Sequence, residues 1–429
     1  MIKSSLVHIV FFLYLYTISY SFLPFSTTVM FGIFGLIWFI LQWLTNNFEL
    51  KAKKIILLIL MFLVCIGSVS ILSLSINNTS DIKFISYVPS QIAVLFASYF
   101  VVKVCRKVNY ALNFQTIVSL LINVVFIQSI IVIVMFLSPE VKSFLLGLED
   151  LTDKQLTRIK HLSRFRFYGI GSSKTFFAGI MNGYALILIS IMIRKYSFTS
   201  KQMFILSVKF LLILLVGAMM ARTTFIGALL AVIVLYFPNR FKFSIQNFSK
   251  KFKFTSLTFV LPIIIITVWL SFFQAIGDDT LILIKFGFEM FFSFMESGSF
   301  ETASSNELLQ AFKFPTDVKT YLIGDGYFFH PNLPGSYYMR TDVGYLRLIY
   351  YFGIFGLICY LSMQVVLIIK AYQLFSVDRY LYLFIVIYFL ILNLKGFTDL
   401  LFIHSLFVMA YVLNNYKRKY VFKYNEINM

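Results

Sequence analysis

"YYMRTDVGYLRLIYYFGIFGL", residues 337–357, decides how the chain is interpreted. From Val343 onward the stretch is almost wholly apolar, which is typical of a membrane-spanning helix. Arg340, Asp342 and Arg347 stand at its start, and Arg347 falls where the hydrocarbon should begin. Because charge at that depth is costly, an arginine kept there indicates a functional site. The stretch therefore predicts a membrane fold and a region in which to look for chemistry.

The composition of the whole chain agrees with a membrane protein. Of its 429 residues, 60% are hydrophobic and only 13% are charged, too few polar residues to cover a soluble domain of this size. We predict one all-α membrane domain over residues 1–429, a polytopic integral helical bundle of about twelve transmembrane helices. The expected spans lie near 6–23, 27–44, 55–74, 86–104, 114–137, 173–193, 203–220, 223–238, 255–273, 343–369, 380–395 and 397–413.

Basic residues orient the predicted spans. The formal net charge is +19, and Lys and Arg gather in short segments between spans, such as 45–54 and 239–254, and in the C-terminal tail. Because positive residues favour the cytoplasmic side, we place these segments and both termini inside. The high positive charge therefore marks orientation, and nucleic-acid binding is not expected.

Residues typical of metal or cofactor chemistry are sparse. The three cysteines and four histidines are scattered without metal-ligand spacing. Neither a dinucleotide-binding glycine fingerprint nor a Walker loop occurs in the sequence. We therefore expect no metal and no cofactor.

Two of the predicted extracytoplasmic loops are long, about 138–172 and about 274–342. Loops of this length are commonly functional, and the aromatic residues, Gly and Pro among their charges predict folded caps rather than linkers. Within the second loop, residues 280–297 are apolar, with Lys285 and Glu289 four apart. This segment predicts a helix lying in the outer membrane interface, with a re-entrant segment as the alternative.

The second half of the first loop, residues 154–174, is basic although its predicted side of the membrane disfavours such residues. Arginine forks suit phosphate oxygens. "GIGSSK" (169–174) also opens a helix, where free N–H groups favour an anion. We predict an anion site containing Arg164, Arg166 and Lys174, with contact to anionic lipid headgroups as the alternative.

"MARTTFIG" (220–227) places Arg222 at the outer turn between two spans that almost no loop separates. Such a tight turn does not need an arginine. The side chain either reaches the lipid headgroups by snorkelling or points into a cavity. Because unpaired charge near the membrane indicates a site, we favour the cavity.

The start of the opening stretch offers further candidates. Arg340 and Arg347 are seven residues apart, two helical turns, so they share a face if the helix begins early. Asp342 either caps that helix or serves as a proton acceptor. Tyr345 completes the predicted binding residues of this stretch.

Upstream, "LIGDGYFFHPNLPG" (322–335) is rich in turn residues and aromatic side chains, as in a loop that grips a substrate. Asp325 and His330 within it are further candidate proton acceptors. Near the last hairpin, Lys395 and Asp399 are four residues apart and are expected to neutralise each other.

Three segments together resemble the Wzy-type O-antigen and capsular polysaccharide polymerases of the O-antigen polymerase–ligase superfamily. They are "GIGSSKTFFAG" (169–179), "MARTTFIG" (220–227) and "GDGYF…RTDVGYLRLIYYFGIFGL" from Gly324 to Leu357. The expected spans with two large outer loops are similar as well. Related ligases carry a His-Asn-like element before this span, whereas here His330 is followed by Pro331, which favours a polymerase.

The resemblance implies a metal-independent glycosyltransferase of the bacterial cytoplasmic (inner) membrane. It would move a glycan chain from undecaprenyl pyrophosphate to the sugar of a new lipid-linked repeat unit on the extracytoplasmic face. A flippase and a chain-length co-polymerase would be partners. The alternatives are an O-antigen ligase with lipid A–core as acceptor and a flippase for lipid-linked oligosaccharide. Because the charges lie at the span ends, transport through the midplane is less favoured.

Overall fold

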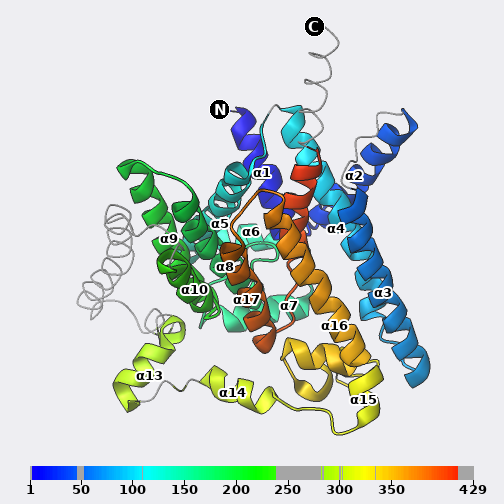
Figure 1. Cartoon of the computed structure of the whole chain (residues 1–429). Helices are drawn as coiled ribbons and strands as arrows, with labels where there is room; N and C mark the ends of the chain where they lie inside the picture. Colours follow the sequence, from blue (N-terminus) through cyan, green and yellow to red (C-terminus); the bar gives the residue numbers. More distant parts are fainter. Residues whose placement is uncertain are drawn as a thin grey trace. The chain divides into compact units, whose positions relative to one another are not determined.

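The computed structural model describes residues 2–45, 53–108, 110–237, 282, 285–298, 301, 303–333 and 335–413. Over these residues the regular secondary structure is helical (Figure 1), and the β-type pairings are two isolated bridges, Tyr20–Glu149 and Phe329–Tyr337. The chain divides into two compact units. Unit 1 comprises Met1–Leu15, Phe25–Ile117 and Ala303–Met429, and unit 2 comprises Tyr16–Pro24 and Val118–Thr302.

Seven helices in the described part are long and apolar enough to cross a membrane. They are α2 (Thr27–Leu44), α3 (Lys53–Asn77), α4 (Lys83–Lys107), α5 (Phe114–Leu137), α8 (Thr175–Lys195), α9 (Ser200–Met220) and α16 (Gly344–Gln373). The shorter apolar helices are α1 (Ile2–Tyr16), α10 (Thr224–Tyr236) and Leu401–Leu413. The helix α17 spans Arg379–Lys395. The prediction of a polytopic helical membrane protein is confirmed. The count of twelve spans stays a prediction, and the expected span 255–273 lies outside the described residues.

Large apolar side chains are exposed on the surfaces of α2 and α3. Ile37 and Leu41 of α2 are 50% and 56% exposed, and Met61 and Val64 of α3 are 61% and 65% exposed. Soluble proteins rarely expose so much contiguous apolar surface. These helices therefore suit hydrocarbon as their solvent, as expected for a membrane-embedded protein.

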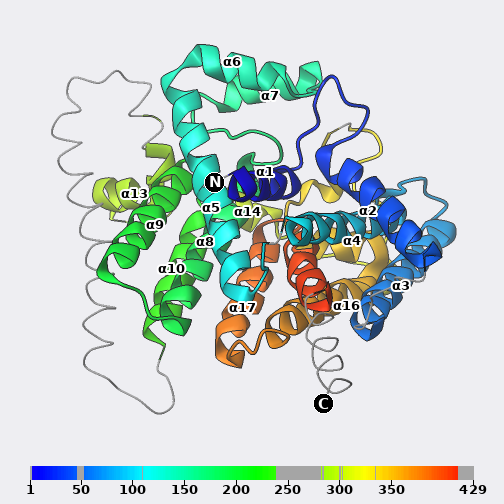
Figure 2. The same ribbon diagram turned by 90° about the horizontal axis from the view of Figure 1, so that it is seen from above.

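In unit 1, α2 packs on α4, and α3 packs on both α4 and α16 (Figure 2). The close approach of α2 to α4 depends on glycine, because a Cβ at Gly35 would lie 2.0 Å from the carbonyl oxygen of Phe96. The helix α16 also packs on α17 and on the short helix α15 (Val318–Ile323).

A kink at Phe352 and Gly353 interrupts α16 within the predicted span. Gly353 has a positive φ of 69°, and a Cβ there would lie 2.2 Å from the Leu322 carbonyl oxygen. On the other side of this contact, Asn77 of α3 donates a hydrogen bond to the Gly324 carbonyl at 2.9 Å. The kink thereby seats the turn-rich segment after α15 against the first turns of α16.

In unit 2, α8 packs on α9 and α10. The crossing of α8 and α10 is tight, since a Cβ at Gly227 would lie 2.1 Å from the Cα of Gly183. Two short helices, α6 (Pro139–Gly147) and α7 (Asp153–Leu162), follow α5. The Ser138 side chain caps α6, and a reciprocal Thr152–Gln155 capping box begins α7.

The helix expected over 280–297 is present as α13 (Glu289–Ser297), with its first residues only partly described. Its ion pairs differ from the spacing-based expectation. Glu289 pairs with Arg222, and Lys285 lies 3.4 Å from Glu296. Two further helices follow it, α14 (Ala303–Ala311) and the 3₁₀ turn η2 (Tyr338–Arg340), both in unit 1.

Candidate functional site: two arginine centres

Two arginines of unit 2 meet on a single aromatic ring. The guanidinium carbon of Arg166 lies 4.6 Å from the centre of the Phe286 ring, and that of Arg222 lies 4.5 Å from it. Arg222 also donates from Nε to the Phe286 carbonyl at 3.1 Å and forms an ion pair with Glu289. We call these four side chains the arginine pair site. It brings together two of the residues that the sequence predicted as anion ligands.

The local chain path explains how the two arginines meet. The helix α9 ends at Met220, Ala221 is extended, and α10 begins at Thr224, so Arg222 lies in the short turn that was predicted. The segment bearing Arg166 is tied to the end of α9, since the Phe167 N–H donates to the Met219 carbonyl at 3.0 Å. Both arginines are therefore positioned by the backbone.

A hydrophobic cluster seats the segment that carries Phe286 and Glu289. Phe288 and Phe292 pack against buried side chains that include Phe167, Val216 and Met219. This apolar contact fixes the start of α13 beside the turn after α9, and it accounts for the position of the Glu289 carboxylate on Arg222.

The two arginines of the arginine pair site differ in their partners. Glu289 forms an ion pair with Arg222. The Nε of Arg166 is buried without a hydrogen-bond partner, and among the described residues Arg166 has no ion pair. Burial lowers the pKa of Arg166, and the nearby Arg222 and Arg158 lower it further. The site therefore has at least one unsatisfied buried donor, which an anion would satisfy.

The other two residues predicted for this anion site lie elsewhere in the loop. Arg164 is exposed. Lys174 is paired with Glu149 at 2.6 Å, and the same carboxylate accepts the Gly171 N–H at 2.9 Å. The "GIGSSK" turn, expected to offer free N–H groups to an external anion, is thus already filled by an internal carboxylate.

In unit 1, Arg347 lies in an aromatic cage. Its guanidinium carbon is 3.9 Å from the centre of the Phe328 ring and 3.5 Å from the centre of the Tyr337 ring. The residue is 7% exposed, its Nε has no hydrogen-bond partner, and no ion pair to it occurs within the described part of the chain. Arg347 is thus a buried cation stacked between two aromatic rings, with an unpartnered Nε.

Asp81 builds the cage, although nothing in the sequence pattern identified it. Its Oδ2 accepts the backbone N–H groups of Phe328 and Phe329 at 2.8 and 3.0 Å, and its carbonyl accepts the Tyr351 hydroxyl at 2.6 Å. It lies before α4, more than 240 residues from the loop that it holds. Its role in holding this loop could be predicted only from a known contact between these distant parts of the chain.

Two predictions for the start of α16 are corrected. Arg340 does not share a helical face with Arg347, because α16 begins at Gly344 and Arg340 has a positive φ of 53°. Asp342 does not cap the helix, and it is exposed. The hydroxyl of the neighbouring Thr341 accepts the N–H of Val343, the residue just before the helix, at 3.3 Å. The Tyr345 hydroxyl donates to the Leu390 carbonyl at 2.7 Å, a packing contact between α16 and α17.

The remaining predicted proton acceptors lie in the loop beside the cage. Asp325 accepts the Thr320 hydroxyl at 2.7 Å. Burial, together with the Asp325 charge, raises the pKa of Tyr338 to about 12. His330 accepts the Asn332 N–H through Nδ1 at 3.2 Å. Asp325 and His330 are therefore both held by local contacts of their side chains.

The partly buried Asp399 is held differently from the sequence-based expectation. Its Oδ2 accepts Tyr87 and Gln91, each at 2.9 Å, and its Oδ1 accepts Gln364 at 2.7 Å and the Leu401 N–H at 2.8 Å. Four neutral donors, rather than Lys395, satisfy the carboxylate. This network joins α4, α16 and the last hairpin.

Among the described residues, no group of three or more His, Cys, Asp and Glu side chains lies together in a way that could hold a metal ion. Comparisons with protein-family models, with curated proteins and with solved structures find no match to this chain. Function is therefore inferred from the chemistry of the arginine pair site and of the cage around Arg347.

Proposed function

We propose that this membrane-embedded chain is an oligosaccharide repeat-unit polymerase. It would act on the extracytoplasmic face of a bacterial inner membrane, in O-antigen or capsule biosynthesis. The donor is a glycan chain on undecaprenyl pyrophosphate, and the acceptor is a sugar hydroxyl of a new lipid-linked repeat unit. The observation that carries this proposal is the convergence of Arg166 and Arg222 on Phe286, with the Nε of Arg166 buried and unpartnered.

The arginine pair site suits a diphosphate. Guanidinium forks bind phosphate oxygens in a bidentate manner, and two of them match a group that carries more than one negative charge. The unpartnered Nε of Arg166 is a donor already removed from water, so a phosphate oxygen would satisfy it. Fixed donors in a partly dry site stabilise charge more strongly than the same groups in water.

The reaction needs this stabilisation of negative charge when the donor sugar separates from the diphosphate. The bond from the anomeric carbon to the diphosphate oxygen breaks, and both electrons leave with the diphosphate. A new bond forms from the same carbon to the acceptor hydroxyl oxygen, and the hydroxyl proton is released to a base or to the departing diphosphate. Arg166 and Arg222 would stabilise the negative charge that develops on the leaving group.

Arg347 supports the same class of function independently. A buried guanidinium without a carboxylate is costly to maintain, which favours a role with an anionic or strongly polar ligand. Its two flanking rings are of the kind that also stack on sugars and prenyl chains. Asp325, His330 and Asp342, in the same unit, remain candidate proton acceptors.

The test uses a bacterial strain whose surface polysaccharide depends on this gene. Replacing Arg166 and Arg222 together with Ala is expected to abolish the ladder of long polymer on a gel, while the membrane level of the protein stays unchanged. Arg379→Ala, a change at an exposed arginine on α17, serves as the matched control and should leave the ladder intact. An unchanged ladder in the double variant would sink the proposed site.

The deletion phenotype separates the polymerase from the ligase alternative. Loss of a polymerase leaves single repeat units attached to the lipid core. Loss of a ligase leaves the core bare, and long lipid-linked polymer accumulates. A bare core would contradict the assignment as a polymerase while leaving the diphosphate site intact as a hypothesis.

A further inference from the structure

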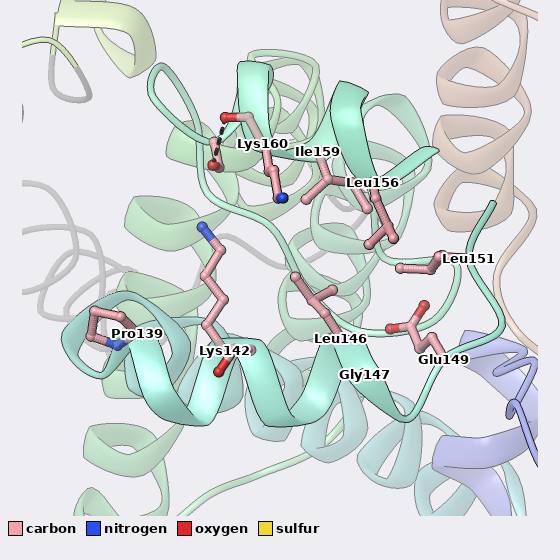
Figure 3. Close-up of a pocket in the computed structure, with 11 residues that line it drawn as sticks. Pro139, Lys142, Leu146, Gly147, Glu149, Leu151, Leu156, Ile159 and Lys160 are labelled. Atoms are coloured by element: carbon pink, nitrogen blue, oxygen red, sulfur yellow. Dashed lines mark hydrogen bonds between the residues drawn. The ribbon is translucent and has the colours of Figure 1, made fainter. Parts of the chain in front are cut away.

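A pocket lies between α6 and α7, apart from both arginine centres. Its volume is about 440 Å³, within the range of small-ligand sites. Figure 3 shows Lys142 of α6 and Lys160 of α7 pointing toward each other across the opening. Leu146, Leu156 and Ile159 line the interior beside them. Two cations thus face a common space above an apolar wall.

The positive charge in this pocket is not neutralised by the protein. Glu149 lies at one end of the pocket, but both of its carboxylate oxygens are already used by Gly171 and Lys174. Neither Lys142 nor Lys160 forms an ion pair with any described residue. Partial burial also lowers the pKa of Lys142. Two like charges held toward one space without a counter-ion leave room for an anion between them.

The nature of the cations favours one kind of anion. Lysine ammonium groups act as point charges and do not form the bidentate fork of arginine. They therefore suit a singly charged phosphodiester, whereas the arginine pair site suits a diphosphate. The leucine and isoleucine wall adds affinity for a ligand that carries an aliphatic chain next to its phosphate.

The position of the pocket in the chain brings such a ligand within reach. The membrane-spanning helix α5 ends at Leu137, which is 73% exposed, and α6 begins two residues later at Pro139. The end of a spanning helix marks the headgroup level, so α6 starts where phospholipid headgroups lie. Phe144 of α6, 66% exposed, offers an additional apolar anchor.

We propose that the α6–α7 pocket binds the headgroup of an anionic phospholipid, with the phosphodiester between Lys142 and Lys160 and the adjoining methylenes on the leucine and isoleucine wall. This site is separate from the donor site and does not depend on the proposed reaction. It would fasten the first outer loop to the membrane surface and thereby hold the loop that bears Arg166.

The test measures hydrogen–deuterium exchange of residues 139–163 in the full chain, in nanodiscs of phosphatidylcholine with or without phosphatidylglycerol. Because two lysines near the surface each favour anionic lipid, we expect exchange in this segment to slow about tenfold when phosphatidylglycerol is present. The Lys142→Ala/Lys160→Ala variant should lose this protection. Lys319→Ala, at an exposed lysine on α15, should keep it, and so should Lys142→Arg/Lys160→Arg.

Three outcomes would overturn the proposal. One is equal exchange in both lipid mixtures. Another is full protection in the double-alanine variant, which would assign the effect to other basic residues of this strongly positive chain. The third is equal protection by inorganic phosphate in pure phosphatidylcholine discs, which would make the pocket a site for free anions. The readout is local to α6 and α7, so it is independent of whether the chain makes polymer.

Discussion

The buried Arg347 and the partly buried Asp399, both in unit 1, have opposite surroundings. Every carboxylate oxygen of Asp399 accepts two hydrogen bonds from neutral donors. Arg347 instead lies between two rings, and its Nε has no partner. A satisfied buried charge stabilises the fold that surrounds it, whereas an unsatisfied one costs free energy until a ligand arrives. The difference separates a charge with its hydrogen bonds satisfied from one with an unsatisfied donor, within the same helical unit.

The largest expected effect comes from Arg347→Met. Methionine fills a similar volume without a buried charge, so the loss of ring contacts and the relief of desolvation should offset each other to within about 1 kcal/mol. Polymer formation should fall about 100-fold or more if the guanidinium stabilises charge in the reaction. The measurements are the unfolding temperature in detergent and the polymer ladder.

Arg347→Lys is the matched variant for that experiment. It keeps the charge but loses the planar group that stacks on Phe328 and Tyr337, so activity should be intermediate. A large drop in unfolding temperature for Arg347→Met, with activity in proportion to the remaining folded protein, would make Arg347 a structural residue and remove the contrast with Asp399.

Asp399→Asn should produce the reverse pattern. An amide NH₂ would face either Tyr87 and Gln91 or Gln364 and the Leu401 N–H, and two buried donors would lose their acceptor. The expected cost is about 2–4 kcal/mol of unfolding free energy. Thermal unfolding in detergent measures it, with Asp150→Asn at an exposed position as the control. A stable Asp399→Asn protein that makes no polymer would mean that Asp399 acts in the chemistry.

The sequence predicts these regions unequally, for physical reasons. Long apolar runs fix the helices, so the expected bounds 27–44 and 114–137 coincide with α2 and α5. The turn at Arg222 follows from two such runs meeting with almost no loop. The expectation that Arg340 shares a helical face with Arg347 is wrong, because Met339 and Arg340 adopt positive φ angles and so cannot belong to the first turn of α16. No local sequence pattern predicts these positive φ angles.

The partners of the predicted site residues were much harder to foresee. Glu289 reaches Arg222 from 67 positions along the chain, and spacing alone assigned it to Lys285. Asp399 has a charged neighbour four residues away, yet two of its four hydrogen bonds come from α4, more than 300 residues distant. Helical periodicity reports faces within one element, whereas these contacts depend on how separate elements pack.

A smaller effect is expected from Glu289→Gln at the arginine pair site. The change removes the one counter-ion that competes with a diphosphate for Arg222. Since the pair is mostly buried, we expect binding of a short-chain prenyl diphosphate to tighten by about fivefold, equivalent to about 1 kcal/mol. Calorimetric titration of the purified protein measures this. Weaker binding would show instead that Glu289 positions the arginine for its ligand.

The smallest effect is expected from Glu296→Gln on the same helix, α13. Its partner Lys285 lies 3.4 Å away, and the two side chains are 66% and 50% exposed, so water and salt screen the pair. Both the unfolding free energy and the diphosphate affinity should change by less than about 0.5 kcal/mol. This variant removes the same charge from the same element as Glu289→Gln. An equal gain in diphosphate affinity in both variants would therefore show that long-range charge, rather than the contact with Arg222, controls the site.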